Sequence, residues 1–360
     1  MSPNPYVWQR VSLDLVYGRD ELLGSLLSDL GSGRSVALVG GRKIGKTTVL
    51  RKLEIEILSS LASGNRDHTL IPAYVDTLAL AHPTSQFSIY FEILRELEKN
   101  LAVAGLNFSL LKRFESGVRE RGLEFSTFRA SLLACVREIT NSRKVRFAVL
   151  LDEVEPITQS AWSSGFFGNW RHLISNDPEI SPWVTAIFSG AKEMSALSSD
   201  IGSPIANVLS LRMLGPLSWP ASRALVNEPT KNELPPIIAR RIFSLTGGHP
   251  FLIQFLMQQV CNFAAGGAEE MVDKANGAFF ETQSGQFSSW WNDRFSEDDR
   301  RVYLLISGLR GVQLPKICLC CSLVRPRSRQ LRVSGPTASC AGIGKQGIKP
   351  MVRCLRSGLF

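Results

Sequence analysis

The 360-residue chain lacks the features that mark membrane and secreted proteins. No apolar run reaches the roughly eighteen residues that a membrane-spanning helix needs. The first ten residues, MSPNPYVWQR, lack the basic-then-apolar order of a secretory signal peptide. We therefore expect a cytoplasmic protein with no membrane partner.

Side chains that bind structural metals are also few. The four histidines are scattered along the sequence, and none lies near the cysteines Cys318, Cys320 and Cys321. A structural zinc site is therefore not expected. Cys135 and Cys261 lie within apolar helical patterns, which predicts small buried thiols.

Acidic residues are missing from the tail, residues 317–360. This segment contains eight Lys or Arg and no Asp or Glu, so the rest of the chain carries 33 basic against 32 acidic residues. Of the overall net charge of +9, the tail therefore carries +8 and the body +1, and the total says little about a nucleic-acid partner of the body. Two interpretations stay open. One is a basic arm that binds nucleic acid or an anionic surface; the other is the product of a frameshift or truncated gene, which the unpatterned composition favours.

The remaining composition is that of a globular protein. Apolar residues make up 44% of the chain and charged residues 20%, which excludes wholesale disorder. The length leaves room for two or three domains.

Apolar strands alternate with helical patterns over residues 1–215. Five strands are predicted from short apolar runs, at residues 35–39, 70–75, 145–151, 183–189 and 208–213. Helical patterns lie at residues 17–31, 46–62 and 84–140, the last one broken near Gly105 and again near residues 117–122. Strands separated by helices predict an α/β core with a parallel sheet covered on both faces. From residue 216 to about residue 282 the pattern is helical only.

The first predicted strand runs into a glycine-rich loop that opens a helix. Residues 40–47, GGRKIGKT, fit the phosphate-loop pattern G-x-x-x-x-G-K-[ST]. Glycines let backbone N–H groups wrap phosphates, and the helix N-terminus adds partial positive charge. We expect Lys46 to reach the β- and γ-phosphates of ATP and the Thr47 hydroxyl to ligate Mg²⁺. The residues assigned to the nucleotide here are Gly40, Gly41, Arg42, Lys43, Ile44, Gly45, Lys46, Thr47 and Thr48.

The third predicted strand ends in two carboxylates, Asp152 and Glu153. Ligands of parallel sheets bind at the carboxyl ends of the strands, so both side chains are placed for chemistry. We expect Asp152 to serve Mg²⁺ and Glu153 to polarise the attacking water. Glu155 is a weaker third candidate, better interpreted as a solvated loop residue. A pair of helix-capping carboxylates is the structural alternative.

Two further motifs give the chain a family resemblance. Residues 16–21, VYGRDE, resemble a hydrophobic-Gly-Arg-Glu box that lies beside adenine, and residues 246–250, TGGHP, resemble a GGHP-like motif that opens a lid helix. With the phosphate loop and the carboxylate strand, they make residues 5–310 similar to the AAA+/STAND class of P-loop ATPases, in particular the archaeal-type ATPase (novel STAND) family. The resemblance implies that Tyr17, Gly18, Arg19 and Pro250 lie at the nucleotide. For TGGHP a local interpretation is also open: a helix stop at glycine, with proline starting the next helix.

The resemblance implies the three-layer architecture of a P-loop NTPase. Its parallel sheet has the order 5-1-4-3-2, a helical lid occupies residues 216–282, and an incomplete winged helix starts within residues 283–316. Ser189 takes a sensor position at the end of the fourth strand, although serine is also an ordinary strand-end residue. Arg171 and Arg212 are candidate charge-stabilising arginines, or else partners of surface acids. Because members of the family tend to assemble with ATP bound, self-association is expected.

These features together predict an ATP-binding, Mg²⁺-dependent ATPase that hydrolyses slowly and acts as a nucleotide-controlled switch. Two alternatives stay open. One is a DNA-associated ATPase of the loader or transposition type, and the other is a nucleotide-binding module without significant turnover. The sequence names neither the signal nor the protein partner.

Overall fold

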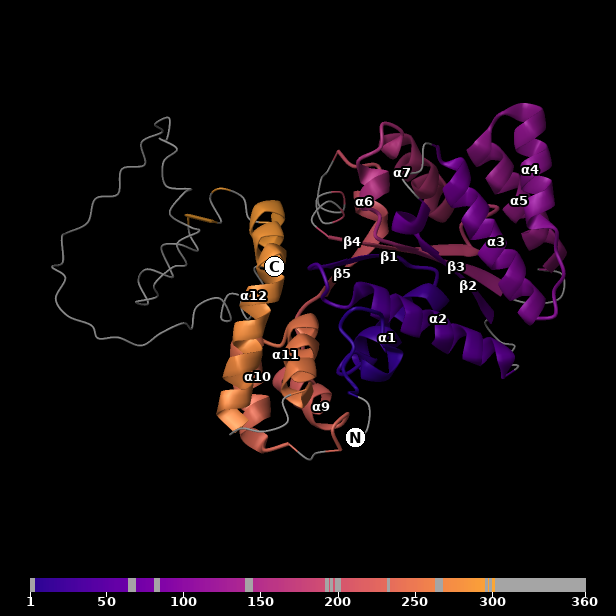
Figure 1. Cartoon of the computed structure of the whole chain (residues 1–360). Helices are drawn as coiled ribbons and strands as arrows, with labels where there is room; N and C mark the ends of the chain where they lie inside the picture. The colour runs from indigo at the N-terminus through magenta and orange to yellow at the C-terminus, as the bar shows by residue number, and fades with distance from the viewer. Residues whose placement is uncertain are drawn as a thin grey trace, which may run out of the picture.

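The computed structural model describes residues 4–63, 69–80, 85–139, 145–191, 194, 197, 202–231, 234–262, 268–294, 297 and 300–301. Within them, a five-stranded sheet carries helices on both faces, and a separate group of helices follows it in the chain (Figure 1). The predicted tail and most of the predicted winged-helix start lie outside the described residues.

The strands are β1 (Ser35–Gly40), β2 (Thr69–Asp76), β3 (Val145–Asp152), β4 (Val184–Gly190) and β5 (Leu209–Leu214). The helices around them are α1 (Asp20–Gly31), α2 (Lys46–Ala62), α3 (Phe87–Val103), α4 (Leu110–Arg121), α5 (Glu124–Ile139), α6 (Glu155–Thr158) and α7 (Ser163–Arg171). Short helical turns lie at Leu13–Leu15, Thr77–Leu80, His172–Asn176 and Ala206–Val208. The helices that follow are α9 (Trp219–Asn227), α10 (Pro236–Thr246), α11 (Pro250–Asn262) and α12 (Ala268–Arg294).

All five strands are parallel and lie in the order β2-β3-β4-β1-β5. Read from the β5 edge, this is the predicted order 5-1-4-3-2. Every residue of β1 and β4 is buried, as expected for strands covered on both faces. Because the strands are parallel, the loop after β1 and the residues that end β3 lie at the same edge of the sheet.

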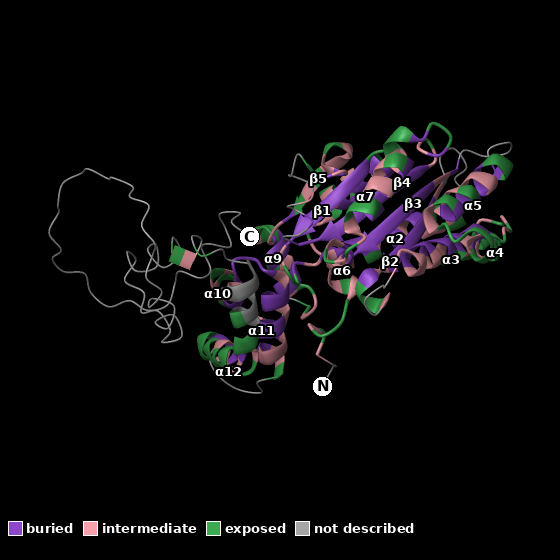
Figure 2. Cartoon of the chain, turned by 90° about the horizontal axis from the view of Figure 1, so that it is seen from above, coloured by how far each residue is buried: buried purple, intermediate pink, exposed green. Residues whose placement is uncertain are grey.

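Alternate residues of the strands feed two separate cores. On one face, Leu38 of β1 packs with Leu26 of α1 and Leu50 of α2. On the other face, aromatic side chains from α3, α5 and α7 pack against β4; the ring centroids of Trp170 and Phe188 lie 5.5 Å apart. Figure 2 shows the buried strands between helices whose outer sides are exposed. The two-residue period of a strand supplies both layers from one segment.

Helices α9, α10, α11 and α12 form a third core, here called the lid. The N-terminal segment, residues 4–8, joins it. Tyr6 is fully buried there and its hydroxyl donates to the Val226 carbonyl at 2.6 Å, while Trp8 Nε1 donates to Gln258 Oε1 at 2.8 Å. The sequence placed this segment in the α/β core. Tyr6 and Trp8 lie outside any periodic sequence pattern, so the sequence did not indicate which core they pack in.

The predicted break near residues 117–122 is confirmed, whereas the predicted boundary at residue 282 differs from the structure. Gly117 does not break the helical stretch; it lies inside α4, where a Cβ would come within 2.5 Å of Thr127 Cγ2, so the glycine permits close packing of α4 on α5. The break is at Gly122, which has a φ of 66° and ends α4. In addition, α12 runs without interruption through residue 282, where the sequence separated the lid from a winged-helix start.

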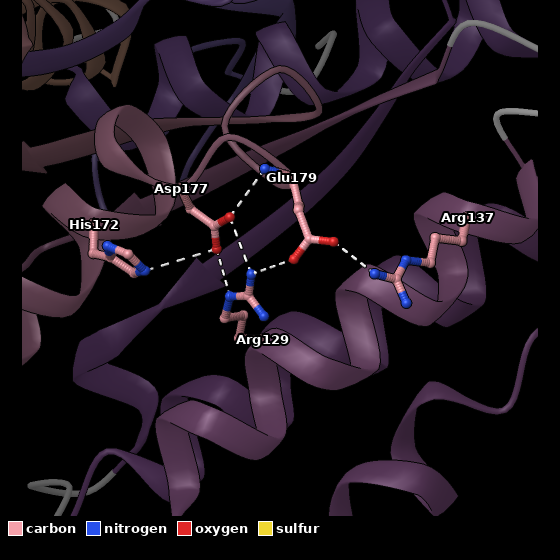
Figure 3. A network of polar contacts seen from close by, with 5 residues as sticks. All are labelled: Arg129, Arg137, His172, Asp177 and Glu179. Carbon is pink, nitrogen blue, oxygen red and sulfur yellow. Dashed lines mark hydrogen bonds and ion pairs between the residues drawn. The ribbon is translucent and has the colours of Figure 1, made fainter.

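A cluster of charged side chains ties α5 to the segment before β4 (Figure 3). Arg129 donates to both oxygens of the buried Asp177 and, at 2.9 Å, to Glu179 Oε2. Arg137 donates to Glu179 Oε1 at 2.6 Å, and His172 Nε2 lies 3.8 Å from Asp177. These bonds hold the pKa of Asp177 below its usual value. The cluster therefore holds the segment that precedes β4 against α5.

Helices in the described part of the chain are all too short or too polar to cross a membrane. Cys135 is buried in α5 and Cys261 is half-buried in α11, which confirms their placement in apolar helix faces.

Candidate functional site

A cavity of about 410 Å³ lies between the carboxyl end of the sheet and the lid. Three segments supply most of its lining: residues 8–19 before and at the start of α1, residues 43–49 of the phosphate loop and α2, and residues 250–254 at the start of α11. Glu153 and Leu217 complete it. The volume falls in the range of small-molecule sites, about 300–1,000 Å³.

The phosphate loop has the backbone that its glycines predict. Gly40 ends β1, and a Cβ there would lie 2.8 Å from the Leu214 carbonyl oxygen, so the tight approach to β5 requires glycine. Gly45 has a φ of 101° and precedes α2, which begins at Lys46 as predicted. Lys43 also lies in the left-handed region, with a φ of 56°. Of the assigned residues, those from Lys43 to Thr48 line the cavity, and Gly40, Gly41 and Arg42 do not.

Lys46 is buried, with 3% of its surface exposed. Its Nζ donates to the carbonyl oxygens of Gly40 at 3.2 Å and Gly41 at 3.3 Å. The same atom lies 3.9 Å from Glu153 Oε1. The ammonium is therefore held at the cavity by its own loop and faces one carboxylate across the site.

Glu153 has a strained backbone, with a φ of 51° in a region that non-glycine residues rarely adopt. Its carbonyl accepts a hydrogen bond from the Thr77 hydroxyl just after β2, and its N–H donates to Asp152 Oδ1 at 3.0 Å. Burial raises the pKa of Glu153 to about 7; the Lys46 ammonium opposes this shift, and the carboxylates of Glu155 and Asp152 add to it. The carboxyl group therefore exchanges its proton near neutral pH.

Asp152 is fully buried at the end of β3 and does not itself line the cavity. Its Oδ2 accepts the Tyr74 hydroxyl at 3.0 Å, so both carboxylate oxygens have protein donors. Thr47, the other expected Mg²⁺ residue, lines the cavity at the first turn of α2. A fixed carboxylate and a threonine hydroxyl fit Mg²⁺, which takes oxygen ligands and commonly keeps several waters.

Glu155 and Ser189 lie behind the cavity. Glu155 is not a solvated loop residue: it begins α6, and its Oε1 accepts the N–H of Ala191 just after β4. Ser189 is fully buried, its carbonyl accepts the Val154 N–H at 3.0 Å, and its hydroxyl has no hydrogen-bond partner among the described residues. The end of β4 is therefore bonded to the segment that carries Glu153, but Ser189 itself does not reach the cavity lining.

The residues of the predicted adenine-binding motif, residues 16–21, have two different roles in the structure. Tyr17 and Arg19 line the cavity, and Arg19 Nη2 donates to the Gly215 carbonyl at 2.7 Å, at the link between β5 and the lid. Gly18 does not line the cavity. It has a φ of 61°, and a Cβ there would lie 2.3 Å from Ala221 Cβ, so the glycine permits close packing on α9.

The TGGHP segment forms the helix stop and helix start that its local interpretation predicts. Gly247 has a φ of 60° and caps α10, and Pro250 is the first residue of α11. Gly248 approaches Leu217 so closely that a Cβ would lie 2.2 Å from its carbonyl oxygen. Pro250 also lines the cavity, so the helix stop brings the start of α11 to the site.

The two candidate arginines lie elsewhere. Arg212 on β5 pairs with the buried Asp29 of α1, with Nη2 and Oδ2 2.8 Å apart. Arg171 donates to the Pro204 carbonyl at 3.2 Å. Neither lines the cavity, and the acid that pairs with Arg212 is buried and not at the surface.

Several cavity residues were not predicted from the sequence. The largest are Trp8 and Phe251, whose ring centroids lie 5.6 Å apart in an edge-to-face arrangement. Lys43 Nζ lies 4.1 Å from the centroid of Phe251 and 5.5 Å from that of Trp8. The phosphate loop therefore contacts the lid directly. The apolar position after the TGGHP proline was the one available sign of Phe251; nothing in the sequence pointed to Trp8.

Known proteins resemble this chain in structure and not in sequence. Neither a family model nor a curated protein matches the sequence. A Walker-type ATPase of Pyrococcus abyssi is 15% identical, with a TM-score of 0.55 over 87% of this chain and 89% of that chain. The ORC2 protein of Aeropyrum pernix, solved in ADPNP–ADP complexes, is 15% identical, with a TM-score of 0.54 over 82% and 76%. The ORC1 protein of the same organism, solved in complex with DNA, is 14% identical, with a TM-score of 0.53 over 85% and 76%.

At these identities the likeness shows the fold alone. The parallel order of the sheet, the phosphate loop after β1 and the acidic end of β3 agree with it. The chain therefore has the α/β fold of P-loop NTPases.

Proposed function

We propose that the chain binds ATP with Mg²⁺, hydrolyses it slowly and acts as a switch whose lid responds to the nucleotide. The observation that carries the proposal is the convergence of Lys46 and Glu153, 3.9 Å apart, at a cavity shared by sheet and lid. Lys46 supplies a held cation for the phosphates. Glu153, with a pKa near 7, is suited to accept a proton from the attacking water at neutral pH.

Thr47 and Asp152 would hold Mg²⁺. When bound there, the ion would neutralise charge on the phosphate oxygens. Asp152 would orient the ion's shell from a carboxylate that is already fixed by two hydrogen bonds.

The switch part of the proposal depends on contacts between the phosphate loop and the lid. Lys43 sits over Phe251 of α11, and Arg19 bonds the link that leads to α9. A phosphate that attracts Lys43 would change its contact with the lid, and this favours lid movement with nucleotide state. We also propose that the chain belongs to the STAND class and self-associates when ATP is bound. The motifs at residues 16–21 and 246–250 support this part of the proposal.

ATP binding and hydrolysis by the full chain test this function. We expect Lys46→Ala to abolish ATP binding, because the phosphates lose their buried cation. Glu153→Gln should keep ATP binding and slow hydrolysis about 100-fold or more, the usual contribution of a general base. Glu179→Gln, in the charged cluster away from the cavity, is the matched control and should hydrolyse ATP normally. Unchanged hydrolysis in Glu153→Gln would refute the assigned role.

A DNA-associated ATPase is the second candidate. One observation favours it: a structural neighbour, the A. pernix ORC1 protein, is solved in complex with DNA. Hydrolysis by the full chain, measured with and without duplex DNA at increasing salt, distinguishes the two. DNA-stimulated turnover that falls steeply with salt supports this candidate, and turnover indifferent to DNA excludes it.

A further inference from the structure

Tyr74 on β2 makes a hydrogen bond to Asp152 that the sequence motifs of the phosphate loop and of the acidic strand end did not predict. Its hydroxyl donates to Asp152 Oδ2 at 3.0 Å. The Tyr74 side chain is 5% exposed and Asp152 is fully buried, so water does not compete for this bond. Since Oδ1 accepts the Glu153 N–H at 3.0 Å, the two bonds together fix the plane of the carboxylate.

Strand register explains how the two side chains meet. In the parallel pairing of β2 and β3, Tyr74 is opposite Leu150 and Asp76 is opposite Asp152. Tyr74 and Asp152 are therefore diagonal neighbours, and residues two apart on a strand point to the same face. That face is the one covered by α2, because Tyr74 and Leu150 pack in the core that contains Leu50.

The other side of the Tyr74 ring is covered by Arg51. The guanidinium carbon of Arg51 lies 3.5 Å from the ring centroid, a close cation–π contact. Arg51 lies on α2, one turn after Thr47, and its Nη1 donates to Glu54 Oε2 at 3.0 Å. The stack therefore connects the helix that carries Thr47 to the strand end that carries Asp152.

The hydroxyl of Tyr74 is held in its protonated form. Burial and the neighbouring Asp152 carboxylate raise its pKa well above the usual value. The hydrogen bond therefore runs from the phenol to the carboxylate.

We propose that Tyr74 is a positioning residue for Asp152, the carboxylate proposed to orient the shell of Mg²⁺, and that Arg51 holds the Tyr74 ring in place. The inference rests on the proposed ATP- and Mg²⁺-binding function. The physical reason is that a carboxylate serving a metal must keep its orientation, and partners behind such ligands typically contribute 10–100-fold to metal affinity. Tyr74 and Arg51 set the position of Asp152 relative to Thr47, which lines the cavity and is the expected Mg²⁺ ligand.

The test is Tyr74→Phe in the full chain, which removes the hydroxyl and keeps the ring. Calorimetry measures ATP binding over a series of Mg²⁺ concentrations and also in EDTA. We expect ATP affinity in EDTA to stay within about twofold of wild type. The Mg²⁺ concentration that gives half of the Mg²⁺-dependent tightening should rise about tenfold.

Tyr90→Phe is the matched control. It also removes a buried tyrosine hydroxyl, one that donates to Gln86 Oε1 at 2.7 Å on the other face of the sheet. Its Mg²⁺ midpoint should equal that of wild type. A Tyr74→Phe variant with the wild-type midpoint, or with equal losses of ATP affinity with and without Mg²⁺, overturns the proposal.

A double variant separates positioning from a general structural role. If Tyr74 acts through Asp152, adding Tyr74→Phe to Asp152→Ala causes no further shift of the Mg²⁺ midpoint, whereas an additive shift contradicts the proposal. Should Tyr74→Phe not fold, Arg51→Met replaces it, because the Arg51 side chain is 44% exposed. We expect a smaller shift in the same direction, and an unchanged midpoint overturns the proposal.

The wild-type chain distinguishes this proposal from the proposed function. If wild-type ATP binding does not respond to Mg²⁺, the metal role fails, and the role of Tyr74 fails with it. Mg²⁺-dependent binding with an unchanged Tyr74→Phe midpoint overturns only the positioning role.

Discussion

Two carboxyl groups at different ends of the sheet, the half-buried Glu153 and the buried Asp177, have opposite electrostatic surroundings. Glu153 follows β3 at the cavity, where burial raises its pKa to about 7 and Lys46 opposes the shift. Asp177 precedes β4, where hydrogen bonds from Arg129 outweigh burial and lower its pKa. The negative charge of Glu153 is therefore only partly compensated by its neighbours. The negative charge of Asp177 is compensated by hydrogen bonds from Arg129.

The backbone shows the same contrast. Glu153 has a left-handed φ of 51°, whereas Asp177 has an ordinary extended backbone with a φ of −87°. Strained, imperfectly paired groups concentrate at functional sites because their surroundings hold them in place. The comparison teaches that a buried acidic residue does not by itself indicate a functional site. What indicates one is whether burial, which raises the pKa, or the hydrogen bonds and charges of the partners, which lower it, have the larger effect.

The largest expected effect on stability comes from removing the partner of Asp177. Arg129→Ala leaves a buried carboxylate without its guanidinium, and should lower the free energy of unfolding by about 2–3 kcal/mol at pH 7. A carboxyl group whose pKa is lowered by folding stabilises the fold at pH values above the pKa that it has in the unfolded chain. This stabilisation is lost as the pH falls through the pKa of the folded state. The difference from wild type, measured by urea unfolding, should therefore shrink toward pH 3.

ATP affinity should not change in Arg129→Ala, because no residue of that cluster lines the cavity. Arg95→Ala is the matched control: its guanidinium is 53% exposed and pairs with Glu92 on the same helix. Such a surface pair contributes about 0–1 kcal/mol. A loss of ATP binding in Arg129→Ala would break the separation between the two ends of the sheet.

A smaller effect, of opposite sign, is expected at the cavity. Because the folded pKa of Glu153 is raised, ionising this group costs stability as pH increases from about 4.5 to about 7. Glu153→Gln removes that cost. Its melting temperature should match wild type near pH 4 and exceed it at pH 8 by about 2–4 °C, the shift that 1 kcal/mol produces in a domain of roughly 150–250 residues.

Glu179→Gln sharpens the comparison further. The pKa of Glu179 is lowered by Arg129 and Arg137, so its substitution should lower the melting temperature at pH 8. The same pH profile for Glu153→Gln and Glu179→Gln would contradict the electrostatic difference between the two ends.

The smallest effect is expected at the contact between phosphate loop and lid. Lys43→Met removes a cation that lies 4.1 Å from the Phe251 ring centroid, a contact worth about 0.5–1 kcal/mol at an exposed site. Thermal unfolding without nucleotide should show this loss. Lys274→Met on α12 removes a lid charge that has no ring contact within the described part of the chain, and should change stability by about half as much or less. Equal losses in the two variants would show that Lys43 does not hold the lid.

Much of the α/β core could be predicted because its signals are local. Helix α2 begins at Lys46 in both sequence and structure, since a left-handed glycine followed by a helix former specifies a start. The five apolar runs became the five strands within one or two residues. Their order came from the family resemblance and not from periodicity, because periodicity carries no information on which strands are neighbours.

The less predictable features depend on close approach between distant segments. Gly18 resembled a nucleotide-box residue, yet it serves the packing of α9 on the start of α1. Trp8 lines the cavity only because residues 4–8 pack on α11. Neither relation leaves a local pattern in the sequence.

By itself, the sequence determined the alternation of strands and helices, the phosphate loop and the acidic end of β3, because each depends on neighbouring residues. Tertiary structure alone decided that Tyr74 and Arg51 stand behind Asp152, that Lys43 meets the lid and that burial raises the pKa of Glu153. Register, crossing segments and desolvation set those relations, and all three arise only when distant parts of the chain pack together.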